Sequence, residues 1–245
     1  MKKHFFFDMD GTLTRSRSEI SDSMVAGLRD LLANGCDVVV VSGATKGQII
    51  KQIGEVTKDV VVMAQNGNHT ELSNGAHLWR NELTKAQKNK VFTIVRKMID
   101  KANLVINDTS DIVEDRICQI SYSLIGHNAP LESKEKSDPD KVIRKGLLES
   151  FEKEVAQLNE LGVQARIGGT TCIDFTIWHK GDNVKRLVEH MGWNKEECVY
   201  IGDALFEGGN DNSVVGIVST QEVVSPMECE ILIRELIKYK DTSFR

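Results

Sequence analysis

Residues 4–17 read HFFFDMDGTLTRSR, an apolar run that ends in two carboxylates and a glycine. The three phenylalanines predict a strand, and in open α/β sheets the reacting groups lie beyond the carboxyl ends of the strands. Alternation along an extended segment points Asp8 and Asp10 the same way. Two such carboxylates repel each other unless a cation lies between them, and Mg²⁺ takes carboxylate and phosphate oxygens together. The segment therefore predicts a magnesium-dependent phosphoryl site.

The two residues that follow suit this chemistry. Gly11 permits a sharp backbone turn, and Thr12 can donate a hydrogen bond to a phosphate oxygen. The alternative is an Asp-Gly turn that merely ends a strand. Average residue usage produces this pattern by chance in roughly a few chains per thousand of this length, which favours the site.

The two ends of the chain show the same alternation of strands and helices. Apolar spacing from Ile20 to Leu31 predicts a helix stopped by Asn34 and Gly35, and the apolar runs before and after it predict buried strands. This order implies a parallel sheet covered by helices. The remaining predicted elements are strands at 37–41, 60–64, 198–201 and 214–218, and helices at 47–53, 181–191 and 227–239.

The middle of the chain has a different pattern. Thr84 and Gln87 form a capping-box pattern before an amphipathic helix. Partly alternating runs at 117–125, 163–167 and 171–178 predict an antiparallel sheet. A long charged helix is expected at 139–161, and polar loops are expected at 108–115 and 132–140. We therefore expect an α/β, Rossmann-like core made of residues 1–82 and 179–245, with an inserted α+β cap domain at 83–178.

Two further signals lie beside predicted core strands. Ser42 and Gly43 follow a valine run and precede a helix whose N-terminus could hold a phosphate oxygen, although Ser42 could equally be an ordinary helix cap. Lys180 opens the helix after the inserted domain. A lysine near a helix start is unfavourable unless an anion is nearby, so Lys180 could neutralise a phosphate, but a lone lysine is more often a solvated surface residue.

The last signal is a glycine-rich loop after the strand at 198–201. Asp203 adds a third strand-end carboxylate, and the glycines at 208 and 209 allow a tight loop that carries Asn210 and Asp211 back to the site. A turn-rich loop without function would also suit these residues. Taken singly, these signals fit ordinary structure, but each follows a predicted core strand or opens a helix, and this agreement favours one site.

The overall composition narrows the class of protein. The 245 residues carry a formal net charge of −5 and a pI of about 5.7, which disfavours a nucleic-acid binder. No apolar run approaches the ~18 residues of a membrane span. The five cysteines are scattered without metal-ligand spacing and predict reduced thiols in a cytoplasmic protein.

On these motifs the chain resembles the haloacid dehalogenase superfamily, subfamily IIB, and within it the eukaryotic-type phosphomannomutases and their bacterial phosphatase relatives. Residues 8–17 match the family's Asp-x-Asp-Gly-Thr-Leu-Thr-x-x-Arg start, and residues 202–211 match its Gly-Asp loop running to Gly-Gly-Asn-Asp. Residues 168–175 resemble the cap segment that leads from Gly-Gly into a strand, and Arg116 falls at a recognisable cap position.

The chain departs from the mutases at three positions. His127 and Lys134 stand where the mutases have arginines that grip the distal phosphate of the sugar, and Gln65 stands where they usually have a glutamate. Arginine grips phosphate with a planar fork, whereas lysine is a point charge and histidine is only partly charged near neutral pH.

The resemblance implies a mechanism with a phosphorylated small-molecule substrate and Mg²⁺ as cofactor. Asp8 would be the nucleophile and Asp10 the general acid and base, with Asp8, Asp203 and the main-chain carbonyl of Asp10 as magnesium ligands. Asn210 and Asp211 would support Lys180 and water. The residues expected to hold the transferring phosphoryl group are Gly11, Thr12, Ser42, Gly43 and Lys180, and those expected to contact the rest of the substrate are Arg17, Arg116, His127, Lys134, Gly169 and Asp174.

Three functional hypotheses follow. We favour a phosphatase acting on a small phosphorylated metabolite, a sugar phosphate, because the cap has lost two expected arginines. The first alternative is a mutase of the phosphomannomutase type, and the second is a non-catalytic relative that binds a phosphometabolite and regulates a partner. A homodimer formed through the cap is also expected.

Overall fold

The computed structural model describes residues 2–104, 106 and 108–242. The chain divides into two compact units, one formed by Met1–Arg80 with His179–Arg245 and the other by Asn81–Trp178. We call the first the core unit and the second the cap unit. The core unit is thus built from both ends of the chain, and the cap unit is inserted between them.

The core unit contains a seven-stranded sheet with the order β11-β10-β1-β2-β3-β4-β5. Strands from β11 to β3 in that order run parallel, and the last two are antiparallel. This confirms the predicted α/β class with a parallel, Rossmann-like sheet. The strands are β1 (His4–Asp8), β2 (Asp37–Val41), β3 (Val61–Ala64), β4 (His69–Glu71), β5 (His77–Arg80), β10 (Cys198–Gly202) and β11 (Ser219–Glu222).

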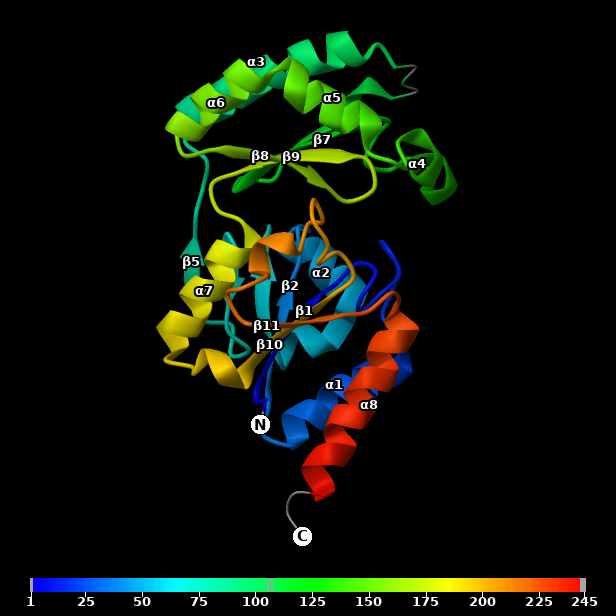
Figure 1. The fold of residues 1–245 in the computed structure, drawn as a ribbon, viewed down its shortest axis with the longest axis vertical. Coiled ribbons are helices and arrows are strands. Elements are labelled where there is room, and N and C mark those ends of the chain that lie inside the picture. Colours follow the sequence, from blue (N-terminus) through cyan, green and yellow to red (C-terminus); the bar gives the residue numbers. More distant parts are fainter. Residues whose placement is uncertain (1, 105, 107, 243–245) are drawn as a thin grey trace. The chain divides into compact units, whose positions relative to one another are not determined.

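Four α-helices accompany this sheet: α1 (Asp22–Ala33), α2 (Lys46–Ile53), α7 (Lys180–Met191) and α8 (Pro226–Thr242). The first and last of them lie side by side although they come from opposite ends of the chain (Figure 1). A Cβ added at Gly27 of α1 would lie 3.1 Å from Ile233 of α8, so the glycine allows this close approach. Across the described part of the chain, none of the helices combines the length and apolar character that a bilayer span requires.

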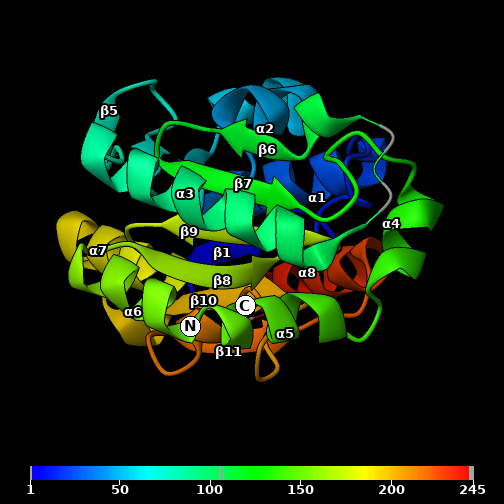
Figure 2. The ribbon, with the colours of Figure 1, turned by 90° about the horizontal axis from the view of Figure 1, so that it is seen from above.

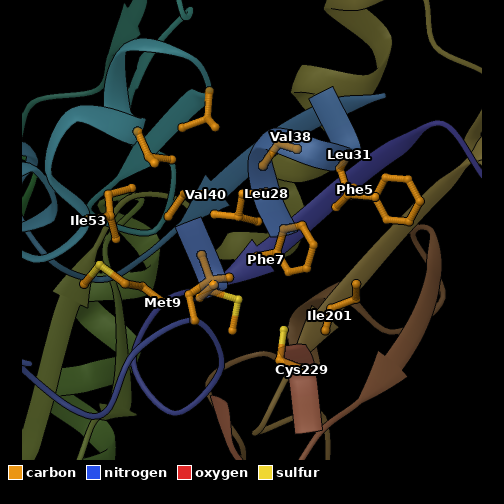
Figure 3. Packing of buried hydrophobic residues seen from close by; sticks show 14 of the residues in the cluster. Phe5, Phe7, Met9, Leu28, Leu31, Val38, Val40, Ile53, Ile201 and Cys229 are labelled. Atoms are coloured by element: carbon orange, nitrogen blue, oxygen red, sulfur yellow. The ribbon is translucent and has the colours of Figure 1, made fainter. Parts of the chain in front are cut away.

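Strand β1 is buried on both of its faces. Phe5 and Phe7 pack with Leu28 of α1 and Val40 of β2 (Figure 3), while Phe6 belongs to the apolar cluster on the other face of the sheet. Burial of a phenylalanine side chain contributes roughly 1.5–3 kcal/mol. The packing therefore fixes β1 from both sides, together with the carboxylate at its end.

The cap unit contains a four-stranded antiparallel sheet with the order β6-β7-β9-β8. Helices α3, α5 and α6 cover one face of this sheet (Figure 2). The capping box predicted at Thr84 and Gln87 is confirmed at the start of α3. The elements are α3 (Lys85–Ala102), β6 (Val113–Asp115), β7 (Gln119–Ser123), α4 (Leu131–Ser137), α5 (Val142–Ser150), α6 (Glu152–Glu160), β8 (Gln164–Gly168) and β9 (Cys172–Thr176).

The two faces of the cap sheet differ in character. In β7, Ile120 and Tyr122 belong to the apolar cluster that includes residues of the helices, while Ser121 alternates with them. Ser121 pairs with Asp174 of β9, which in turn pairs with Arg166 of β8. Because paired residues point to the same side of a sheet, these three side chains share the second face. We call this face the polar face of the cap.

The strand predicted at 214–218 is wrong. Val214 ends a short 3₁₀ turn, Gly216 has a positive φ of 85°, and the strand β11 follows at Ser219–Glu222. Val214 and Val218 are buried in the apolar cluster of the core unit. These valines are apolar because they bury part of a loop in the core. The edge strand β11, by contrast, has four exposed residues.

The helix predicted at 139–161 is also wrong in part, because it is two helices that meet at Phe151. That residue has φ −115° and ψ 25°, outside the helical region, and packs against the apolar cluster of the cap unit. Lys141, with φ 59°, precedes α5 and keeps the helix from beginning at Pro139.

The predicted polar loops contain regular structure as well. The segment 108–115 holds a 3₁₀ turn and the edge strand β6, and the segment 132–140 includes most of α4. The hairpin of β4 and β5 was not predicted. These elements are short and mix polar with apolar residues, so hydrophobic periodicity does not reveal them.

A buried ion pair in the cap unit provides a test of this packing. Arg144 Nε donates to Asp138 Oδ2 at 2.7 Å, and the two side chains are 1% and 2% exposed. We expect Arg144→Leu to lower the free energy of unfolding by about 3–5 kcal/mol, because the Asp138 carboxylate is then buried without its cation. Urea titration measures this loss.

A surface pair of the same unit is the control. Lys136 and Glu132 are 74% and 78% exposed. We expect Lys136→Leu to change the unfolding free energy by less than about 1 kcal/mol. Equal losses in the two variants would contradict the structural role of the buried pair.

Candidate active site

The centre of the candidate site is a buried lysine between two carboxylates. Asp8, the last residue of β1, is 3% exposed, and Lys180, the first residue of α7, is 1% exposed. Lys180 Nζ donates to Asp8 Oδ1 and, at 2.7 Å, to Asp211 Oδ1. A solvated surface role for Lys180, the alternative from sequence, does not fit this position.

A third carboxylate completes an acidic cluster. One carboxylate oxygen from each of Asp8, Asp203 and Asp211 lies within 4.8 Å of the others. Burial and the neighbouring Asp211 and Asp203 raise the pKa of Asp8 well above its usual value despite Lys180, and burial followed by Asp211 raises the pKa of Asp203. A raised pKa means that ionisation of these two carboxyl groups is disfavoured, mainly by burial and further by the neighbouring carboxylates.

This cluster fits a divalent cation. Three carboxylates and one lysine leave two negative charges, and Asp8 Oδ2 is buried without a hydrogen-bond partner among the described residues. An all-oxygen ligand set of this kind suits Mg²⁺ or a similar hard cation. The cluster includes Asp211, which we had assigned only to a supporting role.

Asp10 lies beside the cluster and its side chain has other contacts. Its Oδ1 accepts hydrogen bonds from the main-chain N–H of Arg17 at 2.9 Å and from Gln52 Nε2 at 3.3 Å. The Asp10 carboxylate is therefore held by the loop that follows β1 and by α2. The predicted magnesium contact of Asp10 involves its main-chain carbonyl and stays a prediction.

The turn after β1 is shaped around Asp203. Gly11 has φ 90°, and a Cβ at this position would lie 2.6 Å from Asp203 Oδ2, so only glycine fits. Thr12 is fully buried, and its hydroxyl is 3.5 Å from Asp203 Oδ1. The expected contact of Thr12 with a phosphate oxygen remains a prediction.

The loop after β2 presents Ser42 and Gly43. Ser42 is 2% exposed, and its Oγ accepts a hydrogen bond from the main-chain N–H of Ala44 at 3.1 Å. The N-cap of α2 is Thr45. Ser42 is therefore not the helix cap that the sequence left open.

A strained turn after β3 joins this loop to the helix that carries the lysine. Gln65, Asn66 and Gly67 have positive φ angles of 52°, 59° and 83°. The main-chain N–H of Asn66 donates to the Ser42 carbonyl at 2.8 Å, and Asn183 of α7 donates to the Asn66 carbonyl at 2.8 Å. Asn183 thus links α7 to the phosphate-binding loop we predict, a role that sequence did not suggest.

The glycine-rich loop after β10 places Asp211 and Asn210 differently. Asp211 is fully buried, and a Cβ at Gly202 would lie 2.5 Å from its Oδ2, so Gly202 leaves space for the carboxylate. Asn210 is exposed, and its side chain has no hydrogen bond to a described residue. Asp211 bonds to Lys180, as its predicted supporting role requires, and the role of Asn210 stays a prediction.

Tyr200 was missed by sequence reasoning. Its hydroxyl donates to Asp211 Oδ1 at 2.7 Å and lies 3.4 Å from Lys180 Nζ. Burial, followed by Asp211, raises the pKa of Tyr200 well above its usual value, which keeps the hydroxyl a donor. The sequence offered one signal for this residue: a tyrosine, whose hydroxyl needs a hydrogen-bond partner when buried, within a strand whose other residues are apolar.

In the cap unit, the predicted substrate residues Arg116 and His127 lie close to each other. Arg116 Nε donates to Glu114 Oε2 at 2.7 Å, and Arg116 Nη2 is 3.4 Å from His127 Nδ1. His127 Nε2 is 3.2 Å from the Ser121 carbonyl, which assigns the ring proton to Nε2. Burial lowers the pKa of His127, so the imidazole is neutral near pH 7.

Lys134 and Asp174 are also bound within the cap unit. Lys134 is 8% exposed, and its Nζ donates to the His127 carbonyl at 2.6 Å. Asp174 Oδ1 accepts a hydrogen bond from Ser121 Oγ at 2.6 Å. A Cβ at Gly168 would lie 2.1 Å from Asp174 Oδ2, so this glycine determines where the carboxylate can lie.

Gly169 is held by a residue that sequence reasoning did not single out. Arg144 Nη1 donates to the carbonyls of Gly168 and Gly169 at 3.3 and 3.0 Å. In contrast to these cap residues, Arg17 is an exposed residue of the core unit. The predicted catalytic and phosphate-binding residues thus all belong to the core unit, and most of the predicted substrate residues belong to the cap unit.

Comparison with known proteins gives this arrangement a family. The model of haloacid dehalogenase-like hydrolases matches residues 5–214, and phosphomannomutase 1 of Dictyostelium discoideum is 30% identical over 94% of each chain. The chain belongs to the haloacid dehalogenase-like hydrolase family. This family member is an enzyme that acts on phosphate esters and is close to the phosphomannomutases. The phosphomannomutase of Saccharomyces cerevisiae is 26% identical, with 85% of this chain and 84% of that protein covered.

Solved structures agree on the fold of this haloacid dehalogenase-like hydrolase. A haloacid dehalogenase-like hydrolase from B. subtilis has a TM-score of 0.66 at 13% identity, covering 96% of this chain and 99% of its own. An IMP-nucleotidase of Plasmodium falciparum, with IMP bound, has a TM-score of 0.69 at 15% identity, covering 97% of this chain and 68% of its own. At these identities the likeness concerns the fold alone.

The acidic cluster predicts that a divalent cation stabilises the folded protein. We expect Mg²⁺ at a hundredfold excess over its dissociation constant to raise the unfolding free energy by about 2.7 kcal/mol. Asp203→Asn should remove most of this gain. In chelator the same variant should melt no lower than the parent, because one repelling charge is gone.

The exposed Asp30 of α1 provides the matched control. Asp30→Asn should keep the full response to Mg²⁺. Thermal melting with and without Mg²⁺ measures both variants. The same magnesium response in the two would mean that the cation binds elsewhere.

Proposed function

We propose that this enzyme is a magnesium-dependent phosphatase that hydrolyses a small phosphorylated metabolite, a sugar phosphate, through an aspartyl phosphate on Asp8. The observation that carries the choice of phosphatase is the state of His127 and Lys134. Where the related mutases have arginines for a distal phosphate, this chain has a buried neutral imidazole and an ammonium that donates to a main-chain carbonyl.

The charges on the polar face of the cap support the same choice. Arg116 is 2.6 Å from Glu114, and although burial acts to lower its pKa, Asp174 and Glu114 raise it on balance. The guanidinium is thus already paired with carboxylates. A face of this kind suits the neutral hydroxyl groups of a sugar better than a second phosphate, which would have to compete with Glu114 and Asp174.

In the first half of the proposed reaction, the Asp8 carboxylate attacks phosphorus. The bond from phosphorus to Asp8 forms as the bond to the leaving oxygen breaks, and Asp10 gives that oxygen its proton. Lys180, Ser42 and the main-chain amides near Gly11 stabilise the charge on the transferring group, a large part of catalysis in phosphoryl transfer.

In the second half, water takes the phosphoryl group. Asp10, now ionised, accepts a proton from water as the new oxygen–phosphorus bond forms and the bond to Asp8 breaks. Asp8 and Asp203, with the Asp10 main-chain carbonyl, would hold the magnesium ion, which when bound offsets the negative charge of the phosphoryl group. The buried Asp8 Oδ2, which has no hydrogen-bond partner within the described part of the chain, supports this assignment.

A mutase is the second candidate, and the names of the relatives favour it. Phosphomannomutases cover most of the chain at 25–30% identity. A mutase shares the first half of the reaction, but a sugar monophosphate replaces water, and the diphosphate must turn round without escaping. The two candidates therefore differ in the acceptor and in the grip on a distal phosphate.

Substitution of the two neighbouring aspartates tests the core chemistry. We expect Asp8→Asn to abolish turnover and to leave no covalent phosphate, since the nucleophile is lost. Asp10→Asn should slow turnover by roughly 10²–10⁴, the range for losing a general acid or base. With an aryl phosphate, whose leaving group needs little protonation, this variant should still load phosphate onto Asp8.

Intact-protein mass after brief incubation with the aryl phosphate and Mg²⁺ is the measurement. A phosphate adduct on the Asp8→Asn protein would place the nucleophile elsewhere. Unchanged turnover in Asp10→Asn would remove that residue from the proton transfers.

The ratio of products separates phosphatase from mutase. We expect mannose 1-phosphate and glucose 1-phosphate to be hydrolysed faster than they are isomerised, even with a hexose bisphosphate activator. Each lost charge-assisted hydrogen bond to a distal phosphate costs on the order of 1.5–3 kcal/mol, which raises escape of the intermediate tenfold or more. Free phosphate and hexose 6-phosphate are quantified in the same reaction. An excess of hexose 6-phosphate would show that the enzyme is a mutase.

Arginine substitutions in the cap test the reason for this ratio. His127→Arg combined with Lys134→Arg should shift the ratio toward 6-phosphate. Lys136→Arg, on the exposed side of the same helix, is the control and should leave it unchanged. An unaltered ratio in the double variant would rule out the cap argument.

A further inference from the structure

The hydroxyl of Tyr200 contacts Asp211 of the acidic cluster, and the proposed catalytic scheme does not use this contact. Its ring belongs to the apolar cluster on one face of the core sheet, and the residue is fully buried. Its hydroxyl donates to Asp211 Oδ1 at 2.7 Å. The same oxygen accepts a hydrogen bond from Lys180 Nζ, also at 2.7 Å.

The ring is a rigid support for this hydroxyl. A tyrosine side chain has only two torsions. Here strand β10 fixes the backbone of Tyr200, and its ring packs in the apolar cluster. Lysine, by contrast, has a flexible four-carbon stem with three rotatable donors. The position of Lys180 therefore depends on the acceptors around it, and Asp211 is one of the two carboxylates it binds.

We propose that Tyr200 is a positioning residue for phosphoryl transfer: its hydroxyl orients the Asp211 carboxylate, and Asp211 in turn holds the Lys180 ammonium on Asp8. Without the hydroxyl, Asp211 loses a donor and can rotate about its side-chain torsions. Lys180 then follows Asp211 and is less well placed for the nucleophile. The effect falls on the chemical step, because no part of Tyr200 needs to contact substrate.

The chain offers a matched control for this role. Tyr122 of the cap unit is also fully buried, but its hydroxyl has no hydrogen-bond partner among the described residues. Tyr200→Phe and Tyr122→Phe thus remove the same atom from equally buried rings, and only the first removes a hydrogen bond. Any general effect of deleting a buried hydroxyl appears in both.

The probe is p-nitrophenyl phosphate with Mg²⁺, and the measurement is release of p-nitrophenol. We expect Tyr200→Phe to lower kcat by about tenfold, the effect of a misplaced charge-assisted contact, with KM changed less than about twofold. Tyr122→Phe should leave both within about twofold of the parent. Melting midpoints are recorded so that all rates are taken on folded protein.

A double-mutant cycle with Asp211→Ala tests the route of the effect. If Tyr200 acts through Asp211, adding Tyr200→Phe to Asp211→Ala should lower kcat by no more than about twofold. If the two substitutions instead lowered kcat by independent factors that multiply in the double variant, the proposal would be overturned. An unchanged kcat in Tyr200→Phe would also overturn it. Nitrophenol release reports leaving-group loss whether water or a sugar accepts the phosphoryl group, so a mutase outcome would refute the proposed function without touching this inference.

Discussion

One buried ammonium, that of Lys180, is the interaction on which the rest of the core site depends. It is the cation that the structure places among three converging carboxylates, and it bonds to two of them. Burying like charges together is unfavourable unless each is paired or joined by a metal. The lysine therefore allows the carboxylates to approach one another, yet it leaves enough negative charge to attract a divalent cation. Strand β1 ends at Asp8, helix α7 begins at Lys180, and the loop after β10 supplies Asp203 and Asp211.

The two units differ in how their charged side chains are arranged. The core unit presents three clustered carboxylates with one lysine, a set that could hold a metal ion. On the polar face of the cap, by contrast, Arg116 is paired with Glu114, and burial lowers the pKa of His127. A cationic group that is already paired with a carboxylate offers less attraction for a further anion.

Sequence patterns predicted the parallel core and most of its elements because strong apolar runs such as 37–41 and the phenylalanines of β1 leave few alternatives. They also predicted that Asp8, Lys180 and Asp203 lie close together, because these residues stand at the ends of core strands or at the start of a core helix. They did not reveal contacts that depend on three-dimensional packing. Nothing local distinguishes Tyr200 from a core aromatic residue, or Arg144 from a solvated arginine of a helix. His127 and Lys134 could be recognised as departures, but only the structure shows that both bond within the cap unit.

The discontinuous core has a consequence for how the chain folds during synthesis. Strand β1 lies between β2 and β10, so one of its two neighbours is made almost two hundred residues later. The first 80 residues therefore leave the ribosome with β1 as an unpaired edge strand and without the α8 partner of α1. The cap unit, with its sheet and helices contiguous in sequence, can complete its own contacts first. High contact order then makes assembly of the core the slow step, and the exposed β1 edge is the point at which nascent chains are most prone to associate wrongly.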